Sequence, residues 1–65
     1  MSALISDDLA SAAKWLDDAE SLTRNATVLL ERVSDSLADE AQAAVSLISD
    51  TRERTRKALA SLEHA

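Results

Sequence analysis

The middle of the chain reads Val33-Ser34-Asp35-Ser36-Leu37-Ala38, and this stretch decides the fold. Ser34 has the side chain of a helix N-cap, and Asp35 places a negative charge where the helix dipole favours one. Val33 stands directly before the cap, as the first residue of a hydrophobic staple does. The stretch therefore predicts that a helix begins in the middle of the 65 residues.

A similar stretch, Ile5-Ser6-Asp7-Asp8-Leu9-Ala10, stands 28 residues earlier, with Ser6 in the place of the N-cap. Sequence rich in Ala, Ser and Asp matches itself easily, so the repeat favours two helices without requiring them. We expect an antiparallel hairpin in a single domain. Its approximate bounds are helix 6–32, turn 34–36 and helix 35–63, within a domain of residues 1–65.

Two other arrangements stay open at this point. One unbroken helix would be about 90 Å long at about 1.5 Å per residue. The absence of Gly or Asn from the proposed turn favours that helix over the hairpin. The other arrangement has a third helix starting at Ser49 or Asp50, with Glu53 completing a capping box. All three are helical throughout, because the chain is rich in helix-forming residues and has no Gly or Pro.

Apolar residues follow a heptad repeat, with steps of three and four, in both halves of the chain. The first stripe consists of Ile5, Leu9, Ala12, Leu16, Ala19, Thr23, Ala26, Leu30, Val33 and Leu37. The second consists of Ala41, Ala44, Ile48, Thr51, Thr55, Ala58 and Leu62. A further line of Trp15, Leu22 and Leu29 runs beside the first stripe, so that helix suits a bundle with more than one neighbour.

A lone hairpin of this size buries little apolar area, because much of its core is Ala. Short chains without disulfides or metals usually depend on a second chain. We therefore expect an all-α hairpin that dimerises into a four-helix bundle, with a single long coiled-coil helix as the alternative. The expected oligomer or partner interface is Leu9, Trp15, Leu16, Leu22, Leu29, Leu30, Val33, Leu37, Ile48, Leu59 and Leu62.

Charge is distributed unevenly along the chain, whose formal net charge is −5. In a hairpin the basic segment 52–57 would lie beside residues 13–18, where Asp17 and Asp18 could pair with it. Trp15 would then either pack over Arg52 or fill an intermolecular core. The same segment is the candidate patch for an acidic partner or RNA, and its basic residues are Arg52, Arg54, Arg56 and Lys57.

The composition argues against catalytic, cofactor and metal sites. Without Cys there is no thiol nucleophile or disulfide, and His64 is the only His. Without Gly there is no phosphate-cradling loop. Ser11-Ala12-Ala13-Lys14 matches the S-x-x-K pattern of penicillin-recognising enzymes, but that chemistry needs a much larger scaffold. We expect no enzyme and no cofactor.

Location and partners follow from the same features. No apolar run reaches the roughly 18 residues that span a bilayer, and the start of the chain does not have the form of a secretory signal. We therefore expect a cytoplasmic protein, and the net negative charge makes nucleic-acid and membrane partners unfavourable. In length and expected architecture the chain resembles the Rop-like plasmid copy-number regulators. That resemblance implies a dimer of hairpins, although no RNA-binding motif can be matched onto this sequence.

These observations together predict a small non-enzymatic protein–protein interaction module, such as an adaptor, a chaperone-like subunit or an inhibitor. It would act through self-association, as a homodimer, and through an apolar helix face that binds another protein. One alternative is a purely structural coiled-coil oligomer. The other is a Rop-like RNA-binding regulator that uses segment 52–57.

Overall fold

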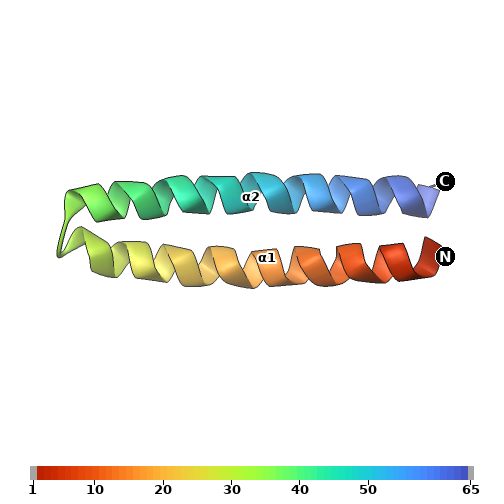
Figure 1. The fold of residues 1–65 in the computed structure, drawn as a ribbon, viewed down its shortest axis with the longest axis horizontal. Coiled ribbons are helices and arrows are strands. Elements are labelled where there is room, and N and C mark those ends of the chain that lie inside the picture. Colours follow the sequence, from red (N-terminus) through yellow and green to blue (C-terminus); the bar gives the residue numbers. More distant parts are fainter. Residues whose placement is uncertain (1, 65) are drawn as a thin grey trace.

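Two antiparallel helices form the computed structural model, which describes residues 2–64 and the side chains of residues 5–64. Helix α1 spans Ser2–Glu31 and helix α2 spans Asp35–His64 (Figure 1). The rod measures 47 × 14 × 12 Å, and α1 begins at the same end of it as α2 finishes. The expected all-α hairpin is confirmed, and the single long helix is wrong.

The start of α1 differs from the expectation. The helix begins at Ser2, so Ser6 lies inside it and is not an N-cap. The residues before Ser6 are Ala3, Leu4 and Ile5, and none of them interrupts a helix. The Ser-Asp pattern at Ser6 therefore resembles a cap without acting as one.

The turn occupies residues 32–34, about two residues earlier than expected. The backbone N–H groups of Val33 and Ser34 both donate to the carbonyl of Leu30, at 2.9 and 2.8 Å. Ser34 then caps α2 as predicted, because its Oγ accepts the N–H of Leu37 at 3.3 Å. One serine thus joins the end of the first helix to the start of the second.

No described residue has a positive φ angle. The chain therefore reverses direction without the left-handed position that Gly or Asn usually fills at the end of a helix. The lack of Gly is for this reason no obstacle to a hairpin. Helix α2 continues through Ser49 and Asp50, so the alternative with a third helix is also wrong.

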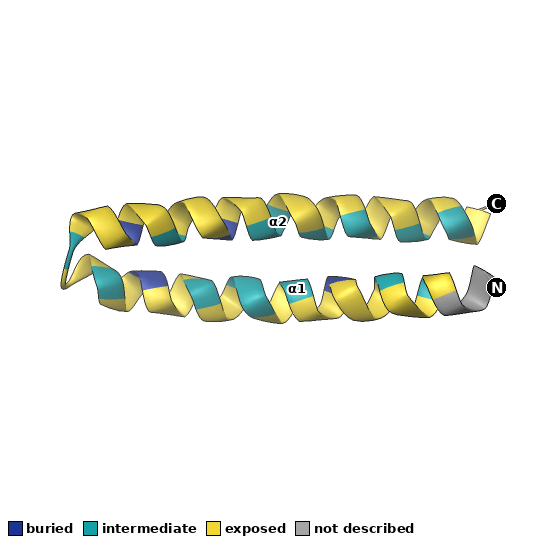
Figure 2. Ribbon diagram, in the orientation of Figure 1, coloured by how far each residue is buried: buried dark blue, intermediate teal, exposed yellow. Residues whose placement is uncertain are grey.

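Each helix turns one heptad stripe toward the other, and we call the two stripes together the seam (Figure 2). On α1 the seam consists of Ser6, Leu9, Ala13, Leu16, Glu20, Thr23, Thr27 and Leu30. On α2 it consists of Ala38, Ala41, Val45, Ile48, Arg52, Thr55, Leu59 and Leu62. All of these residues are buried or half-buried in the hairpin.

Eight of the 17 expected stripe residues lie in the seam, and the other nine are displaced from it by one position. The correct members are Leu9, Leu16, Thr23, Leu30, Ala41, Ile48, Thr55 and Leu62. The members that are exposed instead are Ile5, Ala12, Ala26, Val33, Leu37, Ala44, Thr51 and Ala58, while Ala19 is half-buried. Their places are taken largely by small or hydroxyl-bearing residues such as Ser6, Ala13, Thr27 and Ala38, which suit closely packed helices.

Threonine fits this narrow seam because its hydroxyl is satisfied within its own helix. Thr27 is buried, and its Oγ1 donates to the carbonyl of Thr23 at 2.8 Å. Thr23 in turn donates to Ala19 at 2.7 Å, and Thr55 donates to Thr51 at 2.8 Å. With the hydroxyl paired, burying the side chain costs little, and its methyl group packs as an apolar group does.

Among the side chains that the structure describes, Val45 is the most deeply buried, with 1% of its surface exposed. We predict that Val45→Ala lowers the free energy of unfolding by about 1.5–3 kcal/mol, because buried methyl groups are lost and a cavity remains. The matched control is Val28→Ala, at a position with about half of its surface exposed, where little change is expected. Urea unfolding followed by circular dichroism, at one protein concentration, measures both. Equal losses in the two variants would contradict this burial.

Candidate interaction surfaces and charge cluster

A second heptad stripe on α1 is not covered by α2. Its members, again at steps of three and four, are Ala12, Trp15, Ala19, Leu22, Ala26, Leu29 and Val33. Trp15 has 72% of its surface exposed and Leu22 has 68%, and Leu29 and Val33 are also exposed. Helix α1 thus has a wider apolar surface than α2 can cover. The line of Trp15, Leu22 and Leu29 in the sequence indicated this width.

Helix α2 carries a corresponding exposed stripe at the same offset from its seam. It contains Leu37, Ala44 and Leu47, with Glu40 seven residues before Leu47 and Arg54 seven residues after it. When each helix is viewed from its N-terminus, the exposed stripe is offset from the seam by the same angle and in the same direction of rotation. Because the helices are antiparallel, both stripes lie on one side of the rod, which we call the apolar face.

The opposite side of the rod is polar. Heptad positions place there Lys14, Asp17, Ser21, Arg24, Glu31, Gln42, Ser46, Ser49, Glu53 and Arg56. Among the described residues, Val28 is the only large apolar side chain at these positions. The hairpin as a whole is therefore amphipathic, with the apolar residues that the seam excludes gathered on one side.

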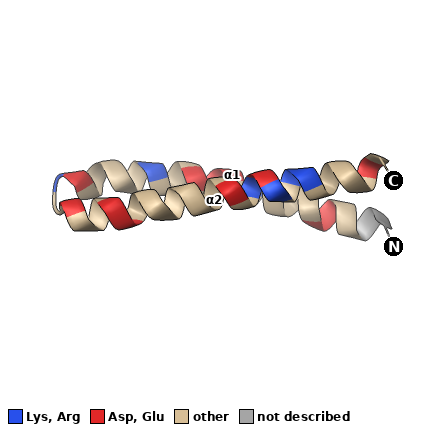
Figure 3. Ribbon diagram, turned by 90° about the horizontal axis from the view of Figure 1, so that it is seen from above, with Lys and Arg blue, Asp and Glu red and all other residues tan. Residues whose placement is uncertain are grey.

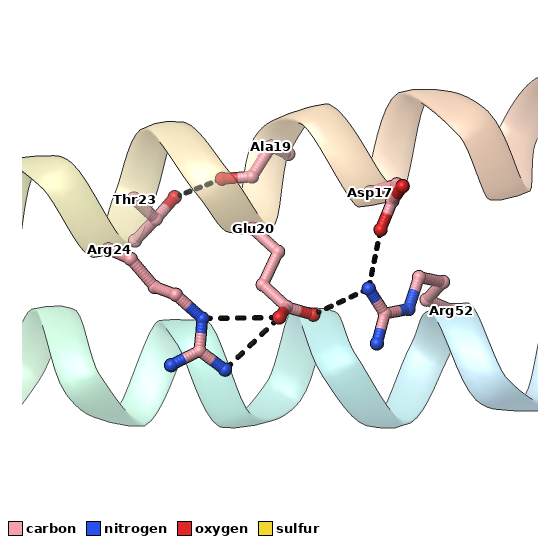
Figure 4. Close-up of polar contacts among 6 residues, drawn as sticks. All are labelled: Asp17, Ala19, Glu20, Thr23, Arg24 and Arg52. Carbon is pink, nitrogen blue, oxygen red and sulfur yellow. Dashed lines mark hydrogen bonds and ion pairs between the residues drawn. The ribbon is translucent and has the colours of Figure 1, made fainter.

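A charge cluster interrupts the seam where sequence analysis found a stretch poor in apolar residues. Arg52 Nη1 lies 2.5 Å from Asp17 Oδ1 and 3.1 Å from Glu20 Oε1 (Figure 4). Glu20 Oε2 also accepts hydrogen bonds from Arg24, at 3.0 and 3.1 Å. The ion pair between Arg52 and Asp17 is the expected pairing across the hairpin, whereas Glu20 was not foreseen.

Glu20 is the central member of this cluster, with only 12% of its side-chain surface exposed. Its Oε1 is buried and has no hydrogen-bond partner, so the contact with Arg52 is an ion pair whose angles do not suit a hydrogen bond. The Arg52 side chain is 25% exposed and points toward the two carboxylates. Packing of Trp15 over Arg52 is therefore wrong, since the guanidinium faces Asp17 and Glu20 and the indole is largely exposed.

Three of the four basic residues of segment 52–57 lie around one groove. Arg52, which also belongs to the seam, lines this groove of about 320 Å³ on α2 together with Arg56, Lys57 and Glu53. Lys57 Nζ lies 3.5 Å from Glu53 Oε1. Arg54 belongs to the apolar face. Viewed from above, the basic segment lies along α2, well away from the acidic residues at the helix ends beside the turn (Figure 3).

Within residues 2–64 there is no group of three or more His, Cys, Asp or Glu side chains arranged to hold a metal ion. Neither of the two helices, over its described length, is both long and apolar enough to cross a membrane. Comparisons with protein-family models, curated proteins and solved structures returned no match.

The charge cluster should contribute measurably to stability. We predict that Arg52→Ala lowers the free energy of unfolding by about 1–3 kcal/mol, because it leaves the largely buried Glu20 with Arg24 as its one cationic partner. The matched control is Arg56→Ala on the polar side, with an expected change within about 0.5 kcal/mol. Chemical unfolding of the two variants side by side gives the comparison, and equal losses would show that Arg52 is not special.

Proposed function

We propose that this protein is a small non-enzymatic interaction module that binds protein chains, first of all a second copy of itself, through its apolar face. The observation that carries the proposal is the exposure of Trp15, Leu22, Leu29 and Val33 on one side of the rod, opposite a polar side. Apolar residues gathered in this way are typical of surfaces that bind other proteins. A cytoplasmic location is part of the same proposal.

The small core of the hairpin supports this proposal. Ala13, Ala38 and Val45 are the buried apolar side chains among the described residues, and two of the three are Ala. By contrast, fully burying one Leu or Val stabilises by about 1.5–3 kcal/mol. A partner that covers Leu22 and Leu29 would therefore add substantially to the apolar burial of the hairpin.

RNA binding through segment 52–57 has weaker support. Arg52 and Lys57 lie beside carboxylates, and Arg54 lies on a different side from Arg56. The only aromatic residue, Trp15, could serve as a stacking platform for bases, but it lies on the apolar face away from the basic groove. The formal charge of −5 also opposes a phosphate backbone.

Self-association can be tested at one position of the apolar face. We predict that Leu22→Glu converts the oligomer into a monomer, because a carboxylate would have to be buried in the interface without a partner. Leu22 is exposed in the hairpin, so the helices themselves should form as before. Sedimentation velocity measures the oligomeric state, and circular dichroism measures the helix content.

The control is Ser21→Glu, which adds the same charge to the adjacent residue on the polar side and should leave the oligomer intact. Wild-type protein that stays monomeric at every concentration tested would overturn the proposed self-association. So would a Leu22→Glu variant that associates as strongly as the wild type.

A further inference from the structure

The side chains of the apolar face follow a pattern that is symmetric about its middle. On α1, Trp15 lies seven residues before Leu22 and Leu29 lies seven residues after it. The intervening positions are both Ala. Leu22 therefore stands at the centre of the stripe, and a large apolar side chain stands seven residues away on either side of it.

On helix α2, charged residues flank a central Leu at the same spacing, with opposite signs. Glu40 lies seven residues before Leu47 and Arg54 lies seven residues after it, so opposite charges flank a central Leu. The two centres lie at the same height along the rod. Leu47 is five residues before Arg52 on α2, and Leu22 is five residues after Asp17, the ion-pair partner of Arg52, on the antiparallel α1.

We infer that a second copy of this chain covers the apolar face in antiparallel orientation, about a two-fold axis that crosses the face at Leu22 and Leu47. The inference rests on the proposed function and specifies the partner of that surface. The axis places α1 over α1 of the second copy and α2 over α2. Leu22 and Leu47 each pack on their own counterpart, and Trp15 packs on Leu29 of the second copy.

Charge complementarity selects this arrangement. The antiparallel axis brings Glu40 opposite Arg54 of the second copy, and symmetry makes this pair twice. A two-fold axis along the rod would instead place α1 over α2, with the Glu40 carboxylate against Leu29 and no cation to pair with it.

Charge reversal tests the pairing of Glu40 with Arg54. Glu40→Arg and Arg54→Glu should each weaken dimerisation about ten- to hundredfold, because two attractive pairs per dimer become repulsive. The double variant should recover most of that loss. The controls Glu31→Arg and Arg56→Glu make the same changes of charge on the polar side and should leave the dissociation constant within about threefold, as expected for exposed charges. A double variant no tighter than the single variants would overturn the pairing.

Cysteine crosslinking tests the axis itself, and the natural chain has no Cys to interfere. Leu22→Cys should be joined to its counterpart in the dimer by a short bismaleimide, whereas the control Ser21→Cys should not. If the protein dimerises but Leu22→Cys is not crosslinked, the antiparallel arrangement is wrong and the proposed function stands. If wild-type protein is monomeric, both fail.

Discussion

The close packing of two helices along a narrow seam is the constraint on which the rest of this structure depends. Small and hydroxyl-bearing residues such as Ala13, Thr27 and Ala38 occupy its buried positions, and Val45 is the largest side chain fully enclosed there. The larger seam residues, such as Leu16 and Ile48, are half-buried, and Trp15 and Leu22 occupy other heptad positions outside the seam. The apolar face is thus a consequence of how the seam packs and of what it excludes.

The charge cluster adds specificity that the apolar seam lacks. A seam in which small residues alternate with Leu and Ile could slip by one heptad with little change in apolar contact. Such a slip would move Arg52 away from Asp17 and Glu20 and leave a largely buried carboxylate without that cation. The ion pairs are therefore better understood as fixing the register of the hairpin than as a large source of its stability.

The sequence was sufficient for the helices, the cap at Ser34 and half of the seam, because these depend on local propensity and on heptad spacing. It was not sufficient to choose between two stripes that share Leu9, Leu16 and Leu30. Counting apolar residues favoured the stripe with Ile5 and Val33, yet the hairpin packs the stripe with Ala13 and Thr27. Side-chain volume and the bonding of Thr hydroxyls to their own helix decided the outcome, and a hydrophobic pattern records neither.

The division of α1 into an inner and an outer stripe connects folding to association. Both stripes exist as continuous surfaces only when the helix is formed, so a partner on the apolar face binds the folded hairpin and not the unfolded chain. Such binding stabilises the hairpin by mass action, and its effect grows with concentration. A hairpin whose own fully buried apolar core is limited to Ala13, Ala38 and Val45 gains more from this coupling than a larger domain would. The modest seam and the large uncovered stripe are thus consistent with a single design, in which association supplies the apolar burial that the fold by itself lacks.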